Sequence, residues 1–335
     1  MNQHKKQRGV IAGCGYFARI HMEAWNRMRD TVAIEACCDI EQDKAFHFGN
    51  QHGITRGYYD YRRMLKNEKP DFVDIVTRPD THFEIAAAAA DLGIAVLCQK
   101  PLAPTLEQSE QLVDYCEQRN VPLMANENWR WQAWFRELKS LLDSGIIGKP
   151  FYFALRHRVP DGVGEHPYAR QPYFAEMPRL LVIETMIHFI DTARFLLGEL
   201  TLRDALLRRV NPHVRGEDVV LLTFEGDGFT GMIDGNRLSA AEQEGPVMGD
   251  MRIEGEHGAL SLRGDGRIWI LPVDAPAREH AYILPTIGYR GDSAYHTLRH
   301  FLDCLTAGRP FETSGREYLK TTRLVFDAYR KAGWS

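Results

Sequence analysis

Apolar and polar residues follow two different patterns along the chain. Over about the first 125 residues, short apolar runs are separated by longer stretches with helical periodicity. Runs that are apolar on both faces predict strands buried in a doubly wound parallel sheet, with helices covering it. The runs are GVIA (9–12), VAIEACC (32–38), DFVDIV (71–76), IAVLC (94–98) and VPLMA (121–125).

Two helix starts can be located within this region. Thr81 and Thr105 are each followed three residues later by Glu or Gln. This is the spacing of a capping box, in which two side chains satisfy backbone N–H groups at a helix start. We therefore expect helices to begin directly after these threonines.

From Phe151 onward the pattern becomes that of an antiparallel sheet. Apolar and polar residues alternate in strands that are joined by turns such as EGDG (225–228) and RGDG (263–266). One long apolar helix, about Leu180–Leu197, interrupts this region, and the chain ends in further helical sequence. The fold class is therefore α/β, with a parallel sheet followed by a mostly antiparallel one.

Length and charge narrow the choice of partner. A chain of 335 residues is about twice the usual domain size, which predicts two domains, residues 1–125 and 126–335. A net charge of −4 and the lack of a long Lys/Arg run argue against nucleic acid. The longest apolar stretch, 85–98, contains Asp91 and is too short to span a membrane. A small molecule is therefore the expected partner.

The N-terminus and the cysteines bear on location. The polar N-terminus leads directly into a short apolar strand, so no signal peptide is expected. The six cysteines have no CxxC spacing, and three of them end predicted strands, where a free thiol behaves as a small hydrophobic group. A reduced, cytoplasmic protein is therefore expected.

A glycine-rich turn follows the first predicted strand. Gly13, Gly15 and Ala18 fit the dinucleotide fingerprint G-x-G-x-x-G/A between a strand and a helix. Gly13 permits the turn, Gly15 lets the backbone approach a pyrophosphate, and Ala18 keeps the helix close to the sheet. The free N–H groups of the helix start then hold the anion. A tight turn that binds no ligand remains the alternative.

Asp39 favours the dinucleotide reading. It ends the second predicted strand, 21 residues after Ala18, where an acid can accept hydrogen bonds from ribose hydroxyls. The same carboxylate repels a 2′-phosphate, and no arginine follows it directly, so NAD is favoured over NADP. Asp39 can also cap or turn the next segment, and the two roles are compatible.

Lys100 lies in VLCQKPLAPT (96–105), just past the carboxyl end of a predicted parallel strand. Ligands of open α/β sheets bind at this edge. A lysine there is more commonly a solvated surface group. However, Pro101 stiffens the position and the neighbouring residues are apolar or neutral, so a lysine beside a cationic nicotinamide would be prepared for proton transfer.

A second group of polar residues lies in LLVIETMIHFIDTARFLLGE (180–199). At 100° per residue, Glu184, His188 and Asp191 fall on one narrow stripe of an otherwise apolar helix. The stripe predicts the wall of an internal cleft, with His188 as general base and Glu184 fixing or polarising it. A buried core histidine is one alternative. A metal site is another, but it needs a further ligand that the spacing does not supply, so no metal is expected.

With these motifs the chain resembles the Gfo/Idh/MocA family, the glucose–fructose oxidoreductase and inositol dehydrogenase group. The resemblance covers nearly the whole chain. The motifs that carry it are GCGYFA (13–18), TRPDTH (77–82), QKP (99–101), NWRW (128–131), ETMIHFID (184–191) and HFLDCLTAGRPFETS (300–314).

The resemblance implies a Rossmann domain followed by an α/β domain for substrate binding and oligomerisation. The large open sheet of that second domain often forms a homodimer or homotetramer interface in the family. Lys100 stands where the family lysine contacts substrate and nicotinamide, and His188 matches the family histidine. Two positions depart from the pattern, since Gln99 replaces the usual glutamate and Glu184 the usual aspartate.

The predicted site combines the motifs with the resemblance. Lys100, His188 and Glu184 are the predicted catalytic residues. The predicted cofactor-binding residues are Gly13, Gly15, Tyr16, Phe17, Asp39, Ile40, Thr77, His82, Gln99, Lys100 and Asn128. The predicted substrate-binding residues are Lys100, Asn128, Arg130, Arg156, His166, Tyr168, Glu184 and His188.

These residues suggest an NAD-dependent sugar or polyol dehydrogenase. His188 would take the proton of the oxidised hydroxyl and Lys100 would polarise its oxygen, giving a lactone from an aldose or a ketone from a secondary alcohol. The Gln-Lys-Pro form is most similar to aldose dehydrogenases of the D-apiose kind. The polar stretch 156–174 offers mixed hydrogen-bonding groups, which suit a neutral sugar better than a phosphorylated one.

Two other functions remain open. The family also resembles glycosidases that retain NAD and recycle it within each turnover. A dinucleotide fold that has lost its chemistry can instead serve as an NAD-binding sensor, although retention of Lys100 and His188 argues against this.

Overall fold

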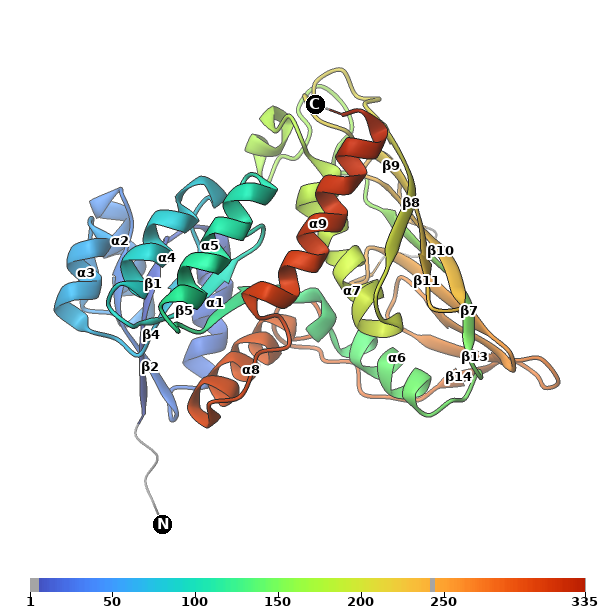
Figure 1. Cartoon of the computed structure of the whole chain (residues 1–335), viewed down its shortest axis with the longest axis horizontal. Helices are drawn as coiled ribbons and strands as arrows, with labels where there is room; N and C mark the ends of the chain where they lie inside the picture. Colours follow the sequence, from blue (N-terminus) through green and yellow to red (C-terminus); the bar gives the residue numbers. More distant parts are fainter. Residues whose placement is uncertain (1–5, 242–244, 335) are drawn as a thin grey trace, which may run out of the picture. The chain divides into compact units, whose positions relative to one another are not determined.

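The computed structural model describes residues 6–241 and 245–334, which divide into two compact units (Figure 1). The first unit comprises the chain up to Asn128 together with Asp292–Lys320. The second comprises Trp129–Gly291 and the residues from Thr321. The strand and helix pattern does not indicate that Asp292–Lys320 returns to the first unit. The predicted domains, 1–125 and 126–335, therefore place this segment in the second domain.

The first unit contains a six-stranded sheet in the order β3-β2-β1-β4-β5-β6, with all pairs parallel. This is the doubly wound Rossmann order, so the predicted fold class is confirmed. Only the short β3 had not been expected. The strands are β1 Gln7–Ala12, β2 Val32–Cys38, β3 Arg56–Tyr58, β4 Phe72–Ile75, β5 Ala95–Gln99 and β6 Leu123–Asn126.

The helices of the first unit follow its strands in alternation. One predicted helix start is confirmed, because Thr105 Oγ1 accepts the N–H of Gln108 at 3.2 Å. The other start also lies at the predicted residue, since α4 begins at His82, but the capping box is absent: Thr81 ends a 3₁₀ turn, and its hydroxyl donates to the Arg78 carbonyl at 2.8 Å. The helices are α1 Tyr16–Arg27, α2 Gln42–His52, α3 Tyr61–Glu68, α4 His82–Ala90, α5 Leu106–Gln118 and α8 Ser293–Ala307.

Helix α8 packs into the core of the first unit. The Phe301 ring lies 5.2 Å from the Phe72 ring of β4 and 5.2 Å from the Phe311 ring. The segment after α8 is bonded to the end of β6, since Thr313 Oγ1 donates to the Ala125 carbonyl at 2.7 Å. Apolar packing and these backbone bonds therefore hold a sequence-distant segment on the Rossmann sheet.

The second unit contains an eight-stranded sheet in the order β14-β13-β12-β11-β7-β10-β9-β8. The pair β7 and β10 is parallel and the others are antiparallel, which confirms the mostly antiparallel second sheet. The strands are β7 Pro150–Arg158, β8 Thr201–Arg208, β9 Val219–Gly226, β10 Phe229–Asn236, β11 Gly249–Gly255, β12 Gly258–Leu262, β13 Ile268–Pro272 and β14 Arg278–His280.

One face of this second sheet packs on helices. Alternate residues of β7 and β10 are buried, as the sequence pattern predicts, and the His157 ring of β7 contacts the Phe189 ring of α7 at 5.3 Å. Figure 1 shows α6 and α7 beside the sheet. The remaining elements are α6 Ala133–Asp143, a π turn at Val182–Met186, α7 Ile187–Leu197 and α9 Gly315–Ala332.

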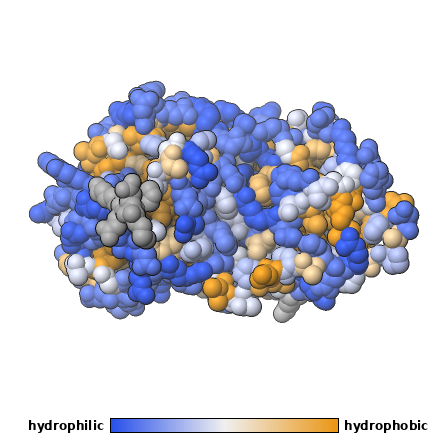
Figure 2. All heavy atoms as spheres, turned by 90° about the horizontal axis from the view of Figure 1, so that it is seen from below, coloured by the Kyte–Doolittle hydropathy of each residue, from blue (hydrophilic) through white to orange (hydrophobic). Residues whose placement is uncertain are grey.

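The hydropathy of the surface and the state of the cysteines can be compared with what the sequence predicts. On the face seen in Figure 2, hydrophilic residues predominate and hydrophobic residues form separate patches. Within the described residues, no helix is long and apolar enough to cross a bilayer. All six cysteines are buried free thiols.

Replacement of Phe301 by alanine should destabilise the first unit. Phe301 is fully buried between two aromatic rings, so its loss should cost about 3–5 kcal/mol of unfolding free energy. Urea unfolding followed by circular dichroism measures this loss. Phe46→Ala is the matched control, because Phe46 is 46 % exposed and should cost less than about 1 kcal/mol. Equal losses in both variants would contradict the packing of α8 described above.

Candidate active site

The glycine turn after β1 leaves open space at the start of α1. Gly13 has a φ of +97°, and a Cβ there would lie 2.3 Å from the Val76 carbonyl oxygen, so the position requires glycine. A Cβ at Gly15 would meet no atom within 4 Å, and Gly15, as the N-cap residue of α1, has no side chain to cap the helix. The first N–H groups of α1 therefore face a space that a phosphate group can enter.

Asp39 joins the glycine turn to the loop after β2. One carboxylate oxygen accepts the N–H of Cys14 at 3.0 Å, and the other accepts the N–H of Glu41 at 3.1 Å. Lys44 Nζ lies 3.3 Å from the same carboxylate. These bonds fix the orientation of Asp39. They leave lone pairs on the carboxylate for ribose hydroxyls, because each oxygen can accept more than one hydrogen bond.

Three predicted cofactor residues present side chains near this turn. Tyr16 is 59 % exposed and contacts the Phe17 ring edge to face, with 5.8 Å between ring centroids. Ile40 follows Asp39 and is 91 % exposed. The exposed side chains of Tyr16 and Ile40 and the open space at Gly15 together provide an accessible surface where a dinucleotide is expected.

His82 has a different place from that expected of a cofactor contact. It is fully buried, with Nδ1 3.2 Å from the Leu102 carbonyl oxygen and Nε2 3.1 Å from the Thr77 carbonyl oxygen. Burial lowers the pKa of His82, while hydrogen bonds to backbone carbonyls oppose this shift. The ring thus joins the loops that follow β4 and β5, and we expect it to act on a cofactor through that backbone.

Lys100 and Asn128 follow neighbouring strands of the Rossmann sheet. Gln99 at the end of β5 pairs in register with Asn126 at the end of β6. The Gln99 Oε1 atom accepts the N–H of Lys100 at 2.8 Å. Lys100 therefore lies at the carboxyl edge, where ligands of such sheets bind.

A buried polar network beneath Gln99 has no sequence motif of its own. His21 Nδ1 lies 2.9 Å from Asp74 Oδ2, which also accepts from Trp25 Nε1 at 2.8 Å. His21 Nε2 lies 2.7 Å from Asn126 Nδ2 and 3.5 Å from Gln99 Nε2. With the proton on Nδ1, the ring donates to Asp74, and the one lone pair of Nε2 accepts from Asn126, the nearer amide. The Gln99 amide lies at the edge of this network.

In the second unit, the segment carrying Glu184 is a π turn and not part of a regular α-helix. The expected helix at about 180–197 is present, since helical structure runs without a break from Leu181 to Leu197, but Val182–Met186 within it is a π turn and α7 itself begins at Ile187. Because a π turn is wider than an α-helical turn, the spacing of 100° per residue does not extend across it. The predicted stripe of Glu184, His188 and Asp191 is accordingly broken between its first two members.

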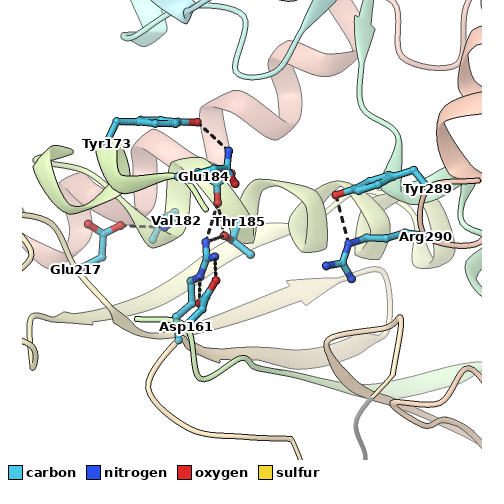
Figure 3. Close-up of polar contacts among 10 residues, drawn as sticks. Asp161, Tyr173, Val182, Glu184, Thr185, Glu217, Tyr289 and Arg290 are labelled. Carbon is cyan, nitrogen blue, oxygen red and sulfur yellow. Dashed lines mark hydrogen bonds and ion pairs between the residues drawn. The ribbon is translucent and has the colours of Figure 1, made fainter. Parts of the chain in front are cut away.

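A buried carboxylate holds the π turn. Glu217 is fully buried and accepts the N–H groups of Leu180 at 3.0 Å and Val182 at 2.9 Å (Figure 3). The Tyr329 hydroxyl donates to Glu217 at 2.6 Å and accepts the N–H of Ile183 at 3.1 Å. Burial raises the pKa of Glu217. These contacts satisfy backbone N–H groups that the start of a helical segment leaves unpaired.

His188 lies at the start of α7 against an indole. Its ring stacks on Trp129, with 4.6 Å between centroids and 7° between planes. Trp129 also meets Phe189 edge to face at 4.8 Å. The stacking fixes the plane of the imidazole, as a directed proton acceptor requires.

Asp191 and Arg130 form a buried pair. Arg130 Nε and Nη2 donate to the two Asp191 oxygens at 2.7 Å and 2.8 Å, and Thr321 Oγ1 donates at 2.9 Å. Asp191 is fully buried, so it supports α7 instead of lining a cleft. Arg130 thereby positions the helix that carries His188. Among the described residues, no cluster of three or more His, Cys, Asp and Glu side chains could hold a metal ion.

The predicted substrate residues on β7 and in the segment after it differ in exposure. Arg156 pairs with Asp250 at 3.0 Å, and His166 is exposed. Tyr168 is only 2 % exposed and packs on the Phe174 ring at 5.7 Å. Arg156 and His166 are therefore accessible, whereas Tyr168 forms part of the core of its loop.

His157 was missed, although it lies in the polar stretch 156–174. It is fully buried on β7, and neither ring nitrogen has a hydrogen-bond partner within the described residues. Burial lowers the pKa of His157 to about 3, so the ring is neutral. Only the alternation along β7 could have shown that it points inward.

Comparison with known proteins places the chain in a family. The family model described as "Oxidoreductase family, NAD-binding Rossmann fold" matches residues 7–127, and the GFO/IDH/MocA C-terminal domain matches residues 135–261. D-apiose dehydrogenase of Paraburkholderia graminis is 36 % identical, over 98 % of this chain and 88 % of that protein. The chain belongs to the GFO/IDH/MocA family of oxidoreductases.

Other members of the family agree with this assignment. D-apiose dehydrogenase of Rhizobium rhizogenes is 32 % identical, over 97 % of this chain and 95 % of that protein. A solved oxidoreductase from Agrobacterium radiobacter, in complex with NAD⁺, L-tartaric acid and magnesium, is 31 % identical. The match covers 98 % of this chain and 97 % of that one, with a TM-score of 0.90.

Membership of the GFO/IDH/MocA family confirms the predicted class and cofactor. The chain is an NAD-dependent dehydrogenase, and its first unit is an NAD-binding Rossmann domain. The open space at Gly15 and the oriented carboxylate of Asp39 fit this cofactor.

Asp39→Ser should shift cofactor preference toward NADP. Loss of a carboxylate that accepts from ribose hydroxyls and repels a 2′-phosphate should raise the ratio of kcat/KM for NADP over NAD about 10- to 100-fold. Steady-state kinetics with both cofactors measure this ratio. Asp60→Ser is a matched control, because Asp60 caps α3 through the N–H of Arg62 and serine can cap as well. An unchanged ratio in Asp39→Ser would contradict the ribose assignment.

Proposed function

We propose that this protein oxidises a hydroxyl group of a neutral sugar or polyol, with NAD as the hydride acceptor. The observation that carries the proposal is the chemistry retained at both predicted catalytic positions: Lys100 lies at the carboxyl edge of the Rossmann sheet, and His188 is held in a fixed plane by Trp129. Relatives named D-apiose dehydrogenase and myo-inositol 2-dehydrogenase favour an aldose or cyclic polyol as substrate.

Lys100 and His188 handle the proton in this proposal. Bound NAD supplies the acceptor for the hydride that leaves the carbinol carbon. A ring nitrogen of His188 accepts the proton of the same hydroxyl, and Lys100 Nζ donates a hydrogen bond to its oxygen. Gly13, Gly15 and Asp39 would hold the cofactor.

Recognition of the other hydroxyls falls to polar groups around these residues. Asn128 follows β6, next to the strand that leads to Lys100. Arg156 and His166 offer exposed donors in the second unit. Arg156 is already paired with Asp250, so its charge is compensated, which favours a neutral substrate over a phosphorylated one.

We further propose that the protein is cytoplasmic and assembles as a homodimer or homotetramer.

The sequence leaves two alternative functions, an NAD-retaining glycosidase and an NAD-binding sensor. They differ from the proposal in whether free NADH accumulates, which provides a direct test.

A substrate panel tests the function. Purified protein is supplied with NAD and with D-apiose, other aldoses, inositols or sugar acids, and absorbance of NADH is followed at neutral and alkaline pH. We expect NADH to accumulate with a branched or linear aldose or with an inositol. Tight NAD binding without NADH formation, together with aglycone release from chromogenic glycosides, would overturn the proposal in favour of a glycosidase.

Lys100→Ala should separate chemistry from cofactor binding. Loss of the polarising amine should lower kcat/KM about 10²- to 10⁴-fold and change the Kd of NAD by less than about threefold. Kinetics with the panel substrate and calorimetric titration of NAD measure the two effects. Lys139→Ala is the control, because Lys139 pairs with Asp143 one turn along α6. Unchanged turnover in Lys100→Ala would refute the role of this lysine.

A further inference from the structure

The polar segment between β7 and the π turn is a tethered loop. The N–H of Gly162 donates to the Arg237 carbonyl at 2.8 Å, and the N–H of Tyr168 donates to the Asp161 carbonyl at 2.7 Å. Asn211 Nδ2 donates to the Gly162 carbonyl at 2.7 Å. The loop, residues 161–177, thus has a defined path even though His166 at its tip is exposed.

Arg237 directly follows β10 and reaches both ends of this segment. Its Nε donates to Asp161 Oδ1 at 2.8 Å, and its Nη2 donates to Asp161 Oδ2. Its Nη1 lies 3.3 Å from Glu184 Oε2 and 3.5 Å from Thr185 Oγ1 (Figure 3). One guanidinium therefore connects the first residue of the loop with the π turn.

The same guanidinium also packs on the interior of the loop. Its central carbon lies 4.9 Å from the Tyr168 ring centroid and 5.2 Å from that of Phe174. Arg237 is 7 % exposed. Its buried positive charge is therefore stabilised by the two carboxylates and the aromatic faces around it instead of by water. Arginine fits this place better than lysine, because a fork of donors can serve Asp161 and Glu184 at once.

We propose that Arg237 is a positioning residue that couples the order of the 161–177 loop to the placement of Glu184. The inference rests on the proposed function, in which the loop belongs to the substrate site and Glu184 to the catalytic group. When the loop is seated, Asp161 and the two rings hold the guanidinium, and the guanidinium holds the Glu184 carboxylate. Displacement of the loop removes that support, so recognition of the sugar and alignment of the catalytic segment occur together.

The exposure of the two acids supports a coupling role over simple core packing. The Asp161 side chain is 41 % exposed and that of Glu184 is 21 % exposed, whereas that of Arg237 is 9 % exposed. The contact at the loop end can therefore open to solvent without unfolding the sheet. A purely structural pair would have no reason to include an acid of the proposed catalytic group.

Hydrogen exchange of the full-length protein with NAD tests the coupling directly. Asp161→Asn should speed amide exchange in residues 161–177 about tenfold, and Arg237→Lys should speed exchange both there and in the π turn. The double variant should exchange no faster than Arg237→Lys alone, because both substitutions remove the same interaction. Unchanged exchange in both single variants, or strictly additive effects, would overturn the proposal.

Kinetics separate positioning from stability. Asp161→Asn should raise KM about 5- to 50-fold with kcat within about twofold, and Arg237→Lys should also lower kcat. Arg203→Gln is the control, since Arg203 forms an exposed pair with Glu225 across β8 and β9 and should change neither constant. A fall in thermal stability with KM and kcat both unchanged would reduce Arg237 to a structural role. Hydrogen exchange is measured without a sugar. A failure of the proposed coupling can therefore be distinguished from a failure of the proposed dehydrogenase function.

Discussion

The second unit depends on the fully buried Glu217 carboxylate beneath the π turn. It accepts two backbone N–H groups and the Tyr329 hydroxyl, so polar groups at the start of this helical segment are satisfied. In the π turn that follows, Glu184 contacts Arg237, and α7 begins at the residue before His188. Glu184 and His188, the two side chains of the proposed chemistry in this unit, thus lie on the segment that begins at this buried carboxylate.

The first unit solves a different problem, the approach of a charged cofactor to backbone. The positive φ of Gly13 and the empty space beside Gly15 expose the N–H groups of α1, while Asp39 is oriented by two backbone donors of its own. The network of His21 and Asp74 beneath Gln99 fixes the strand end that leads to Lys100. Family membership and these features agree on an NAD-dependent dehydrogenase.

The parts predictable from the sequence were those governed by local periodicity. Apolar runs with helices between them predicted the parallel sheet, and alternation predicted the second sheet. The π turn was not predicted, and the Glu217 carboxylate that binds its first N–H groups lies more than thirty residues later in the sequence. The pairing of Arg237 with Asp161 and that of Arg130 with Asp191 were also not predicted, because the partner of a charged residue is determined by the tertiary structure. The place of α8 depends likewise on packing with Phe72.

Deuterium transfer tests the central claim, hydride transfer from a sugar carbon to free NAD, most directly. The panel sugar that the protein turns over is supplied with all carbon-bound hydrogens replaced by deuterium, and the mass of the cofactor is measured after one turnover and after many. The account predicts NADH that carries one deuterium per molecule, in step with oxidised sugar. Deuterium that stays in or returns to the sugar, with the cofactor pool unlabelled, would contradict it.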